Sequence, residues 1–157
     1  INDPALDIDE RTILVIRGAG PLGWPGSAEV VNMQPPDALL KKGITSLPTI
    51  GDGRQSGTAD SPSILNASPE SAAGGGLAWL RTGDVIRIDF NQGQCNVLVA
   101  EAELAARKAD GIPAVPADAT PWQRIYRQSV TQLSDGAVLE GAADFRRIAE
   151  KMPRHNH

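Results

Sequence analysis

The sequence predicts a mixed α and β fold, in which a compact β unit with glycine-rich loops is followed by two or three covering helices. Segments with strand patterns lie before residue 100, and apolar side chains at helical spacing follow it. The chain has 16 glycines and 12 prolines, and glycine clusters lie within residues 18–26, 51–57 and 74–76. Such clusters are typical of tight turns in a folded unit rather than of one linker.

Two different patterns predict the strands. Residues 12–16 (Thr-Ile-Leu-Val-Ile) are a continuous apolar run rich in β-branched residues, which is typical of a strand buried on both faces. In residues 85–90 apolar and polar side chains alternate, and the alternation resumes at residues 95–99 after turn residues. These two runs predict a half-buried hairpin, with Cys95 as a small buried apolar residue.

Three segments are predicted to be helical. Ser68-Pro69-Glu70 favours a short helix with Ser68 as its N-cap, ending at Gly74. Residues 101–109 are strong helix formers and stop before a glycine. Apolar residues then recur at helical spacing from Trp122 onward, so residues 120–157 are expected to form a helical segment packed on the β unit.

Length and charge limit the class of protein. A chain of 157 residues, 41% of them hydrophobic, can bury one sizeable core, so one globular domain is expected. A formal net charge of −4 lacks the basic excess that nucleic-acid binding needs, so no nucleic-acid partner is expected. No apolar run approaches the roughly 18 residues that span a bilayer, and the first residues lack a signal-peptide pattern. The expectation is therefore a soluble, cytoplasmic protein without a membrane partner.

Cys95 is the single cysteine in the sequence. It cannot form an internal disulfide, and one thiolate cannot hold an iron–sulfur cluster or a structural zinc ion alone. The ligands of any metal cluster must therefore come from elsewhere.

Residues 18–23 (Gly-Ala-Gly-Pro-Leu-Gly) match the spacing of a dinucleotide-binding loop and follow a predicted strand. That motif must begin a helix whose amides point at a pyrophosphate. Here Pro21 lies inside the motif, and Trp24-Pro25-Gly26 prolongs the irregular loop. A glycine and proline turn is therefore the favoured interpretation.

Glu29 follows this loop among apolar neighbours. It can be a solvated side chain at the start of a helix, where the helix dipole favours a carboxylate. It can also be an oxygen ligand for Mg²⁺, which commonly takes one or two protein carboxylates. The residue types alone leave both interpretations open.

Residues 51–58 (Gly-Asp-Gly-Arg-Gln-Ser-Gly-Thr) are the most chemically suggestive segment. Its glycines let the backbone approach a ligand, while its polar side chains supply charge and hydroxyls. A Ser–His–Asp triad around Ser56 is hard to build, because the only histidines are His155 and His157. If Ser56 is catalytic, a bound Mg²⁺ is the candidate for stabilising its alkoxide, and a serine-capped turn is the alternative.

Taken together, these motifs resemble those of one family, the dihydroxy-acid and sugar-acid dehydratases, over the whole chain. The segments that carry the resemblance are residues 14–21, 24–29, 51–58, 68–70, 74–76 and 82–84. Residues 24–33 (Trp-Pro-Gly-Ser-Ala-Glu-Val-Val-Asn-Met) and the ending Pro-Arg-His-Asn-His are most similar to the branch that acts on sugar acids.

The resemblance implies that residues 1–157 form the C-terminal, barrel-like β domain of a larger dehydratase, of the swivelling-domain type and incomplete at its N-terminus. The implied cofactors are Mg²⁺ and a [2Fe-2S] cluster, with the cluster ligands in a larger N-terminal domain. That domain is an expected partner, and the family resemblance also implies a homo-oligomer.

The resemblance also implies roles for individual residues, which are carried over from the family motifs position by position. Glu29 is implied to bind Mg²⁺ and Ser56 to be the catalytic base. Thr58 and His157 are implied to contact the substrate. The residues expected to shape the loop are Asp52, Gly53, Arg54 and Gly57.

The implied reaction removes water from a 2,3-dihydroxy carboxylate and gives a 2-keto-3-deoxy acid. D-Xylonate is the expected substrate, with L-arabinonate or 2,3-dihydroxy-3-methylbutanoate as alternatives. A non-catalytic β interaction module is the alternative of a different class. The fragment alone is expected to be inactive, because much of the active site would lie in the N-terminal domain.

Overall fold

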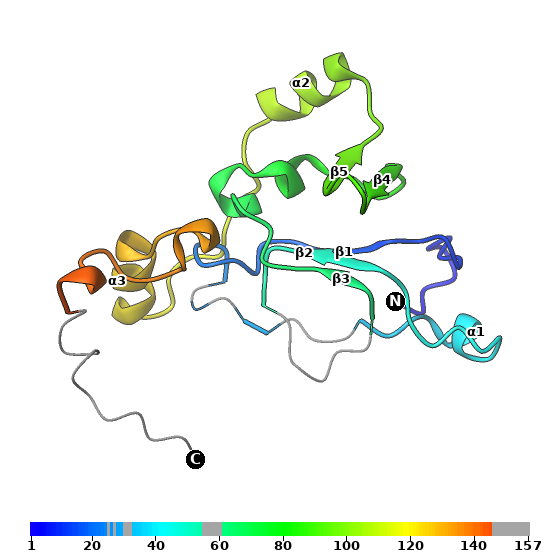
Figure 1. The fold of residues 1–157 in the computed structure, drawn as a ribbon, viewed down its shortest axis with the longest axis horizontal. Coiled ribbons are helices and arrows are strands. Elements are labelled where there is room, and N and C mark those ends of the chain that lie inside the picture. Colours follow the sequence, from blue (N-terminus) through cyan, green and yellow to red (C-terminus); the bar gives the residue numbers. More distant parts are fainter. Residues whose placement is uncertain (25, 27, 30–32, 55–60, 146–157) are drawn as a thin grey trace.

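The centre of the fold is a three-stranded parallel sheet with the order β1-β2-β3 (Figure 1). The computed structural model describes residues 1–24, 26, 28–29, 33–54 and 61–145. The sheet consists of β1 (Leu14–Ile16), β2 (Thr49–Gly51) and β3 (Ser63–Ile64). Because the strands are parallel, the segments that follow β1 and β2 leave from the same edge of the sheet. This edge carries the candidate site.

A small apolar core lies under the other end of the sheet. Leu14, Leu39 and Leu47 are buried together, with Leu39 supplied by α1 (Asp37–Leu40). The partly buried residues that pack against them are Ile8, Met33 and Ile44. The strand predicted from residues 12–16 is confirmed, although it begins at Leu14.

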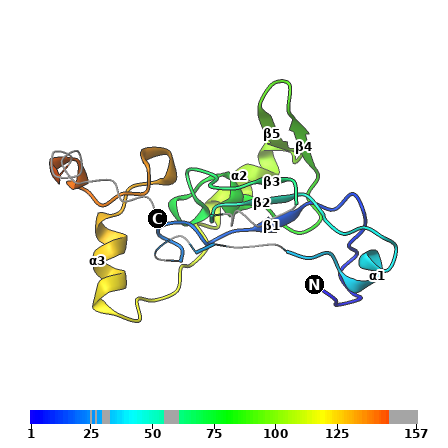
Figure 2. The same ribbon diagram turned by 60° about the horizontal axis from the view of Figure 1, so that its bottom comes forward.

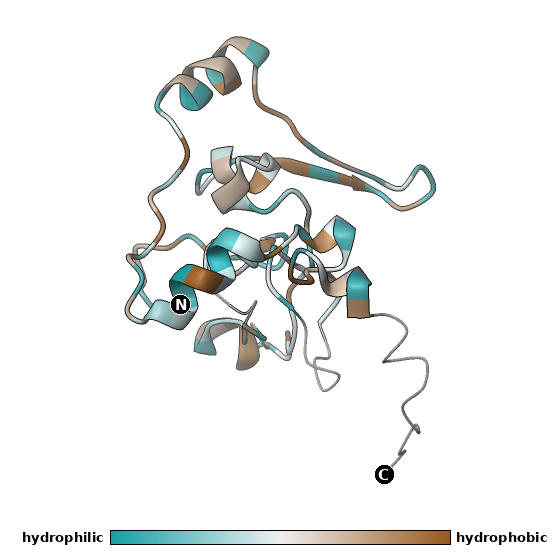
Figure 3. Ribbon diagram, turned by 90° about the vertical axis from the view of Figure 1, so that its left-hand side faces the viewer, coloured by the Kyte–Doolittle hydropathy of each residue, from teal (hydrophilic) through white to brown (hydrophobic). Residues whose placement is uncertain are grey.

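The predicted hairpin is also confirmed. It consists of β4 (Ile86–Asp89) and β5 (Gln94–Val97), which pair antiparallel with Ile88 opposite Cys95. The hairpin projects from the rest of the structure, and apolar and polar residues alternate along it (Figure 3). Its predicted burial is confirmed only in part, because Ile86 and Ile88 are half-buried, whereas Phe90 is 83% exposed and Cys95 is exposed. In the described residues no further strand pairs with these two, and two strands alone cannot bury a face.

The helix predicted over residues 101–109 is confirmed as α2 (Glu101–Ala109). The short 3₁₀ turns are η1 (Ser71–Ala73), η2 (Gly76–Trp79), η3 (Leu133–Asp135) and η4 (Ala142–Phe145). Ser68 is not an N-cap, because its hydroxyl bonds to Ser134 and η1 begins after Glu70. Gly74 does end η1, with a left-handed φ of 77°. Among the described helices, none has the length and apolar character that crossing a membrane requires.

The C-terminal helix α3 (Pro121–Ser129) forms within the segment predicted to be helical, but it does not cover the sheet. Thr120 caps it by accepting a hydrogen bond from the amide of Gln123. No side chain of α3 is buried, and Trp122 is 77% exposed. The helix lies beside the sheet rather than across a face (Figures 1 and 2). Polar contacts hold this region in place instead of an apolar face. Residues 146–157 lie outside the described part of the chain.

The mixed α and β class is confirmed, whereas the barrel is not. In the described part of the chain, the strands are two to four residues long and fall into two separate sheets. They form no closed barrel. The barrel-like architecture therefore stays a prediction from the resemblance.

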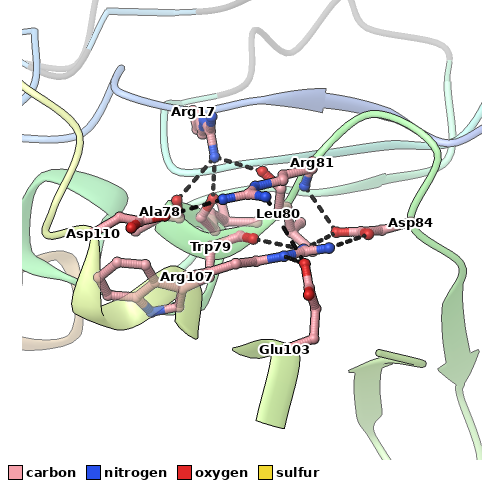
Figure 4. Close-up of polar contacts among 10 residues, drawn as sticks. Arg17, Ala78, Trp79, Leu80, Arg81, Asp84, Glu103, Arg107 and Asp110 are labelled. Atoms are coloured by element: carbon pink, nitrogen blue, oxygen red, sulfur yellow. Dashed lines mark hydrogen bonds and ion pairs between the residues drawn. The ribbon is translucent and has the colours of Figure 1, made fainter. Parts of the chain in front are cut away.

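Arg107 joins α2 to the turn η2 (Figure 4). Its guanidinium donates to both carboxylate oxygens of Asp84, at 2.6 and 3.0 Å, and to the carbonyl oxygen of Trp79 at 2.9 Å. A further hydrogen bond of 2.9 Å reaches Glu103, one turn earlier on the helix. The side chains of Arg107 and Asp84 are only 9% and 10% exposed, so this ion pair is shielded from solvent.

Arg17 fixes the same turn to the end of β1. Its guanidinium donates to the carbonyl oxygens of Leu77, Ala78 and Leu80 at 2.7 to 3.0 Å (Figure 4). The helix α2, the turn η2 and the start of the loop after β1 are thus connected through two arginines.

We expect the contribution of Asp84 to be lost at acid pH. The hydrogen bonds from Arg107 hold the pKa of Asp84 below its ordinary value, although partial burial opposes this shift. Stabilisation from a lowered pKa is complete above the ordinary carboxyl value and disappears as the pH falls through the lowered one. Asp84→Asn should therefore reduce the free energy of unfolding by about 2 kcal/mol at pH 7, with a much smaller difference near pH 2.

Urea unfolding of the full-length protein and of the Asp84→Asn variant, at a series of pH values, measures this difference. A difference that stays constant from pH 7 to pH 2 would contradict the assignment of the stabilisation to the charged pair.

Candidate functional site

Two predicted site segments meet at the carboxyl edge of the sheet. Glu29 and Arg54 form an isolated parallel β-bridge, and the amide of Arg54 donates to the carbonyl oxygen of Ala28 at 3.2 Å. The segment after β1 thus lies beside the segment after β2. Glu29 and Arg54 are 25 positions apart in the sequence, so only the parallel sheet brings them together.

Asp52 connects three segments at this edge. Its carboxylate is fully buried and accepts hydrogen bonds from the amides of Gly18 and Ala19, each at 3.0 Å. The amide and hydroxyl of Ser71 donate to it at 2.9 and 2.7 Å. A buried carboxylate must be hydrogen-bonded to be tolerated, so these donors fix the two loops and η1 around Asp52.

The neighbouring glycines allow this close approach. A Cβ atom at Gly51 would lie 2.9 Å from the carbonyl oxygen of Ile16 and 3.1 Å from Leu65. Gly53 is buried, and its carbonyl oxygen accepts from the amide of Asn66 at 3.0 Å. The segment from Gly51 to Gly53 therefore packs its backbone tightly between β1 and the segment after β3.

The glycine loop at residues 18–23 is a turn, as the sequence favoured. No helix begins in the described residues 18–24. The amides of Gly18 and Ala19 donate to Asp52, and those of Leu22 and Gly23 donate to Glu70. These donors already bind internal carboxylates, so they are not free for a pyrophosphate.

Glu29 fits one position in a magnesium site. It is exposed at the edge of the sheet, and a carboxylate oxygen is a ligand that Mg²⁺ prefers. Among the described residues no group of three His, Cys, Asp or Glu side chains could hold a metal ion. The other ligands would therefore come from elsewhere, as expected for a metal bound by few protein carboxylates.

A [2Fe-2S] cluster does not fit this chain. Such clusters are held mainly by cysteine thiolates, and the sequence has only Cys95. Cys95 lies on the projecting strand β5, and desolvation raises the pKa of its thiol, which disfavours the thiolate.

The other predicted site residues are placed as follows. Ser56, Gly57, Thr58 and His157 lie outside the described residues. The side chain of Arg54 is exposed and lines a cavity of about 670 Å³. The other lining residues are Ser63, Leu65, Asn66, Leu133, Gly136 and Ala137.

Sequence reasoning missed the role of Glu70. It placed this residue in the first turn of a helix, whereas the carboxylate is fully buried against the loop at residues 22–23. Its side-chain partner Gln132 was assigned only to a helical segment, as was Arg127, which binds the same two loop residues. Ser68-Pro69-Glu70 was among the segments that carried the family resemblance, and that was the one signal that marked the position.

Comparison with known proteins places the chain in a family. The family model described as dihydroxy-acid/6-phosphogluconate dehydratase C-terminal matches residues 1–137. The chain belongs to this dehydratase C-terminal family. The resemblance drawn from the sequence motifs is therefore confirmed.

Curated relatives of the chain in this dehydratase family include D-xylonate dehydratase of Caulobacter vibrioides. That protein is 76% identical to the chain over all 157 residues, and the chain covers 26% of its length. The 6-deoxy-6-sulfo-D-gluconate dehydratase of Pseudomonas putida is 39% identical over 98% of the chain, with 26% of that protein covered. L-Arabonate dehydratase of Azospirillum brasilense is 39% identical over the whole chain, with 28% of it covered. The chain spans about a quarter of the length of these relatives.

Proposed function

We propose that the chain is the C-terminal part of a sugar-acid dehydratase that acts on D-xylonate. The observation that carries the proposal is the meeting of Glu29 and Arg54 at one sheet edge, in a chain 76% identical to a D-xylonate dehydratase. Ser56, the proposed base, follows Arg54 by two positions in the sequence.

The proposed reaction breaks the C2–H and C3–O bonds of the sugar acid. Ser56 takes the proton from C2, the C3 hydroxyl group leaves and becomes water after protonation, and a C2=C3 double bond forms. The resulting enol tautomerises to the 2-keto-3-deoxy acid. Ser56 must be deprotonated to act as this base, because a neutral hydroxyl is too weak a base near pH 7.

Glu29 would contribute one carboxylate oxygen to Mg²⁺. When bound, Mg²⁺ supplies positive charge that stabilises the developing enolate and favours the deprotonated form of a nearby hydroxyl. Thr58 and His157 would contact the substrate hydroxyls. The cluster that the family resemblance implies would be held by the rest of the enzyme, because this chain lacks the cysteines for it.

Exposed apolar residues support the proposal that further protein covers this unit. On and beside the hairpin, Val85, Phe90 and Leu98 are 60%, 83% and 55% exposed. On α3, Trp122 and Ile125 are 77% and 52% exposed. Such surfaces are typical of contacts with another domain or subunit, here the N-terminal domain of the same enzyme.

Substrate comparison with the full-length protein, supplied with Mg²⁺ and reconstituted with its cluster, tests this proposal. We expect formation of 2-keto-3-deoxy acid from D-xylonate with a kcat/KM at least about tenfold above that for L-arabinonate, because misplaced hydroxyls leave buried polar groups unpaired. 2,3-Dihydroxy-3-methylbutanoate should be a poorer substrate still.

Preference for 2,3-dihydroxy-3-methylbutanoate would contradict the sugar-acid assignment. Absence of turnover with all three acids would favour the interaction-module alternative.

A further inference from the structure

Glu70 is a buried carboxylate that the proposed reaction does not use. It is fully buried, and the ion pairs among the described residues do not include it. Its oxygens accept from the amides of Leu22 and Gly23, each at 2.9 Å. A buried carboxylate costs free energy unless it is hydrogen-bonded. The loop amides must therefore stay in place to bond to Glu70, and this requirement fixes the positions of these amides closely.

Gln132 holds Glu70 in place from the C-terminal region. Its side-chain nitrogen donates to a Glu70 carboxylate oxygen at 2.9 Å, and its side-chain oxygen accepts from the Glu70 amide at 3.0 Å. The one amide group therefore binds both the side chain and the backbone of Glu70. This geometry fixes the direction in which the carboxylate faces the loop.

Arg127 of α3 binds the same two loop residues from their carbonyl side. Its guanidinium donates to the oxygens of Leu22 and Gly23 at 2.8 and 3.1 Å. Asp118 and the carbonyl oxygen of Pro116 accept from Arg127 at 2.6 and 2.7 Å. The amides and the carbonyls of Leu22 and Gly23 are thus both held by side chains more than 45 positions away in sequence.

The loop fits closely around this carboxylate. A Cβ atom at Gly20 would overlap the carboxylate of Glu70, so the loop can approach only with glycine at that position. Six residues after Gly23 the chain reaches Glu29, which the bridge to Arg54 holds at the sheet edge. The loop that carries the proposed metal ligand is therefore fixed at both ends.

We propose that Glu70 is a positioning residue for metal binding: through the backbone of Leu22 and Gly23 it sets the loop that presents Glu29. Through Gln132 and Arg127, the C-terminal segment also helps to position this loop. This inference rests on the proposed function, in which Glu29 binds Mg²⁺.

Metal binding by the full-length protein tests the role of Glu70. Mn²⁺ replaces Mg²⁺ as the probe, and electron paramagnetic resonance measures the free ion, so the readout does not depend on turnover. Glu70→Gln places an NH₂ donor against the loop amides and should raise the Kd for Mn²⁺ about tenfold, as loss of an outer-shell partner does. Arg127→Lys keeps the charge but cannot bind two carbonyls as a fork, and should raise the Kd in the same direction.

Asp84→Asn is the matched control, because it removes a shielded carboxylate that bonds to Arg107 and the Arg81 backbone and not to Leu22, Gly23 or Glu70. It should lower stability without changing the Kd for Mn²⁺. A wild-type Kd in Glu70→Gln, or in Arg127→Lys if the first variant does not fold, would overturn the positioning role. The same measurement on Glu29→Gln separates the two proposals, because an unchanged Kd there would overturn the ligand assignment itself.

Discussion

Replacing Ser56 by alanine in the full-length enzyme is expected to lower kcat for D-xylonate by about 10³-fold or more, the range that loss of a general base gives. The hydroxyl is the proposed acceptor of the C2 proton, and alanine offers no acceptor. Binding of the metal should be unaffected, because Glu29 supplies the ligand from this chain. The measurement is the rate of 2-keto-3-deoxy acid formation at saturating substrate, with the cluster spectrum recorded on the same sample.

Ser46→Ala is the control for this variant. Ser46 precedes β2, at the opposite end of the strand from the proposed site, so its loss should leave kcat unchanged. Wild-type kcat in Ser56→Ala would remove Ser56 as the base, although the family membership would stand.

Glu29→Gln is expected to weaken Mg²⁺ binding by at least about 100-fold. Loss of a residue that only supports a metal ligand can already cost up to about 100-fold in metal affinity, and Glu29 is proposed to bind the ion itself. The substitution keeps the size of the side chain but removes the negative charge that a divalent ion prefers. Turnover at low Mg²⁺ should be lost and should return in part at high Mg²⁺. Titration of activity with Mg²⁺, together with direct Mn²⁺ binding, measures both effects.

Glu10→Gln controls for the loss of a negative charge. Glu10 is also exposed, and it lies in the N-terminal segment before β1. An Mg²⁺ dependence that is equal in wild type, Glu10→Gln and Glu29→Gln would contradict the role of Glu29.

Local sequence patterns predicted the local elements well. The apolar run before Gly18, the alternation around residue 88 and the helix formers at 101–109 each correspond to an observed element. Burial was predicted less well. Phe90 and Trp122 have the spacing of buried residues, yet they are exposed because nothing in the described residues packs on them. Spacing shows which residues share a face, but not whether another element covers that face.

The candidate site shows the same limit. The sequence motifs identified the family and singled out Glu29 and the segment after β2. They could not show that a parallel β-bridge joins these two segments. Nor could it show the partners of Glu70, because Leu22 and Gly23 take part through backbone atoms that any residue except proline can supply. Contacts made through the backbone leave little trace in one sequence.

Metal binding and turnover measured on the same preparations of wild type, Ser56→Ala and Glu29→Gln test the central proposal most directly. The account predicts that Ser56→Ala binds Mn²⁺ like the wild type and does not dehydrate D-xylonate, whereas Glu29→Gln loses both properties at low metal concentration. Wild-type turnover in Ser56→Ala, or wild-type Mn²⁺ affinity in Glu29→Gln, would contradict it.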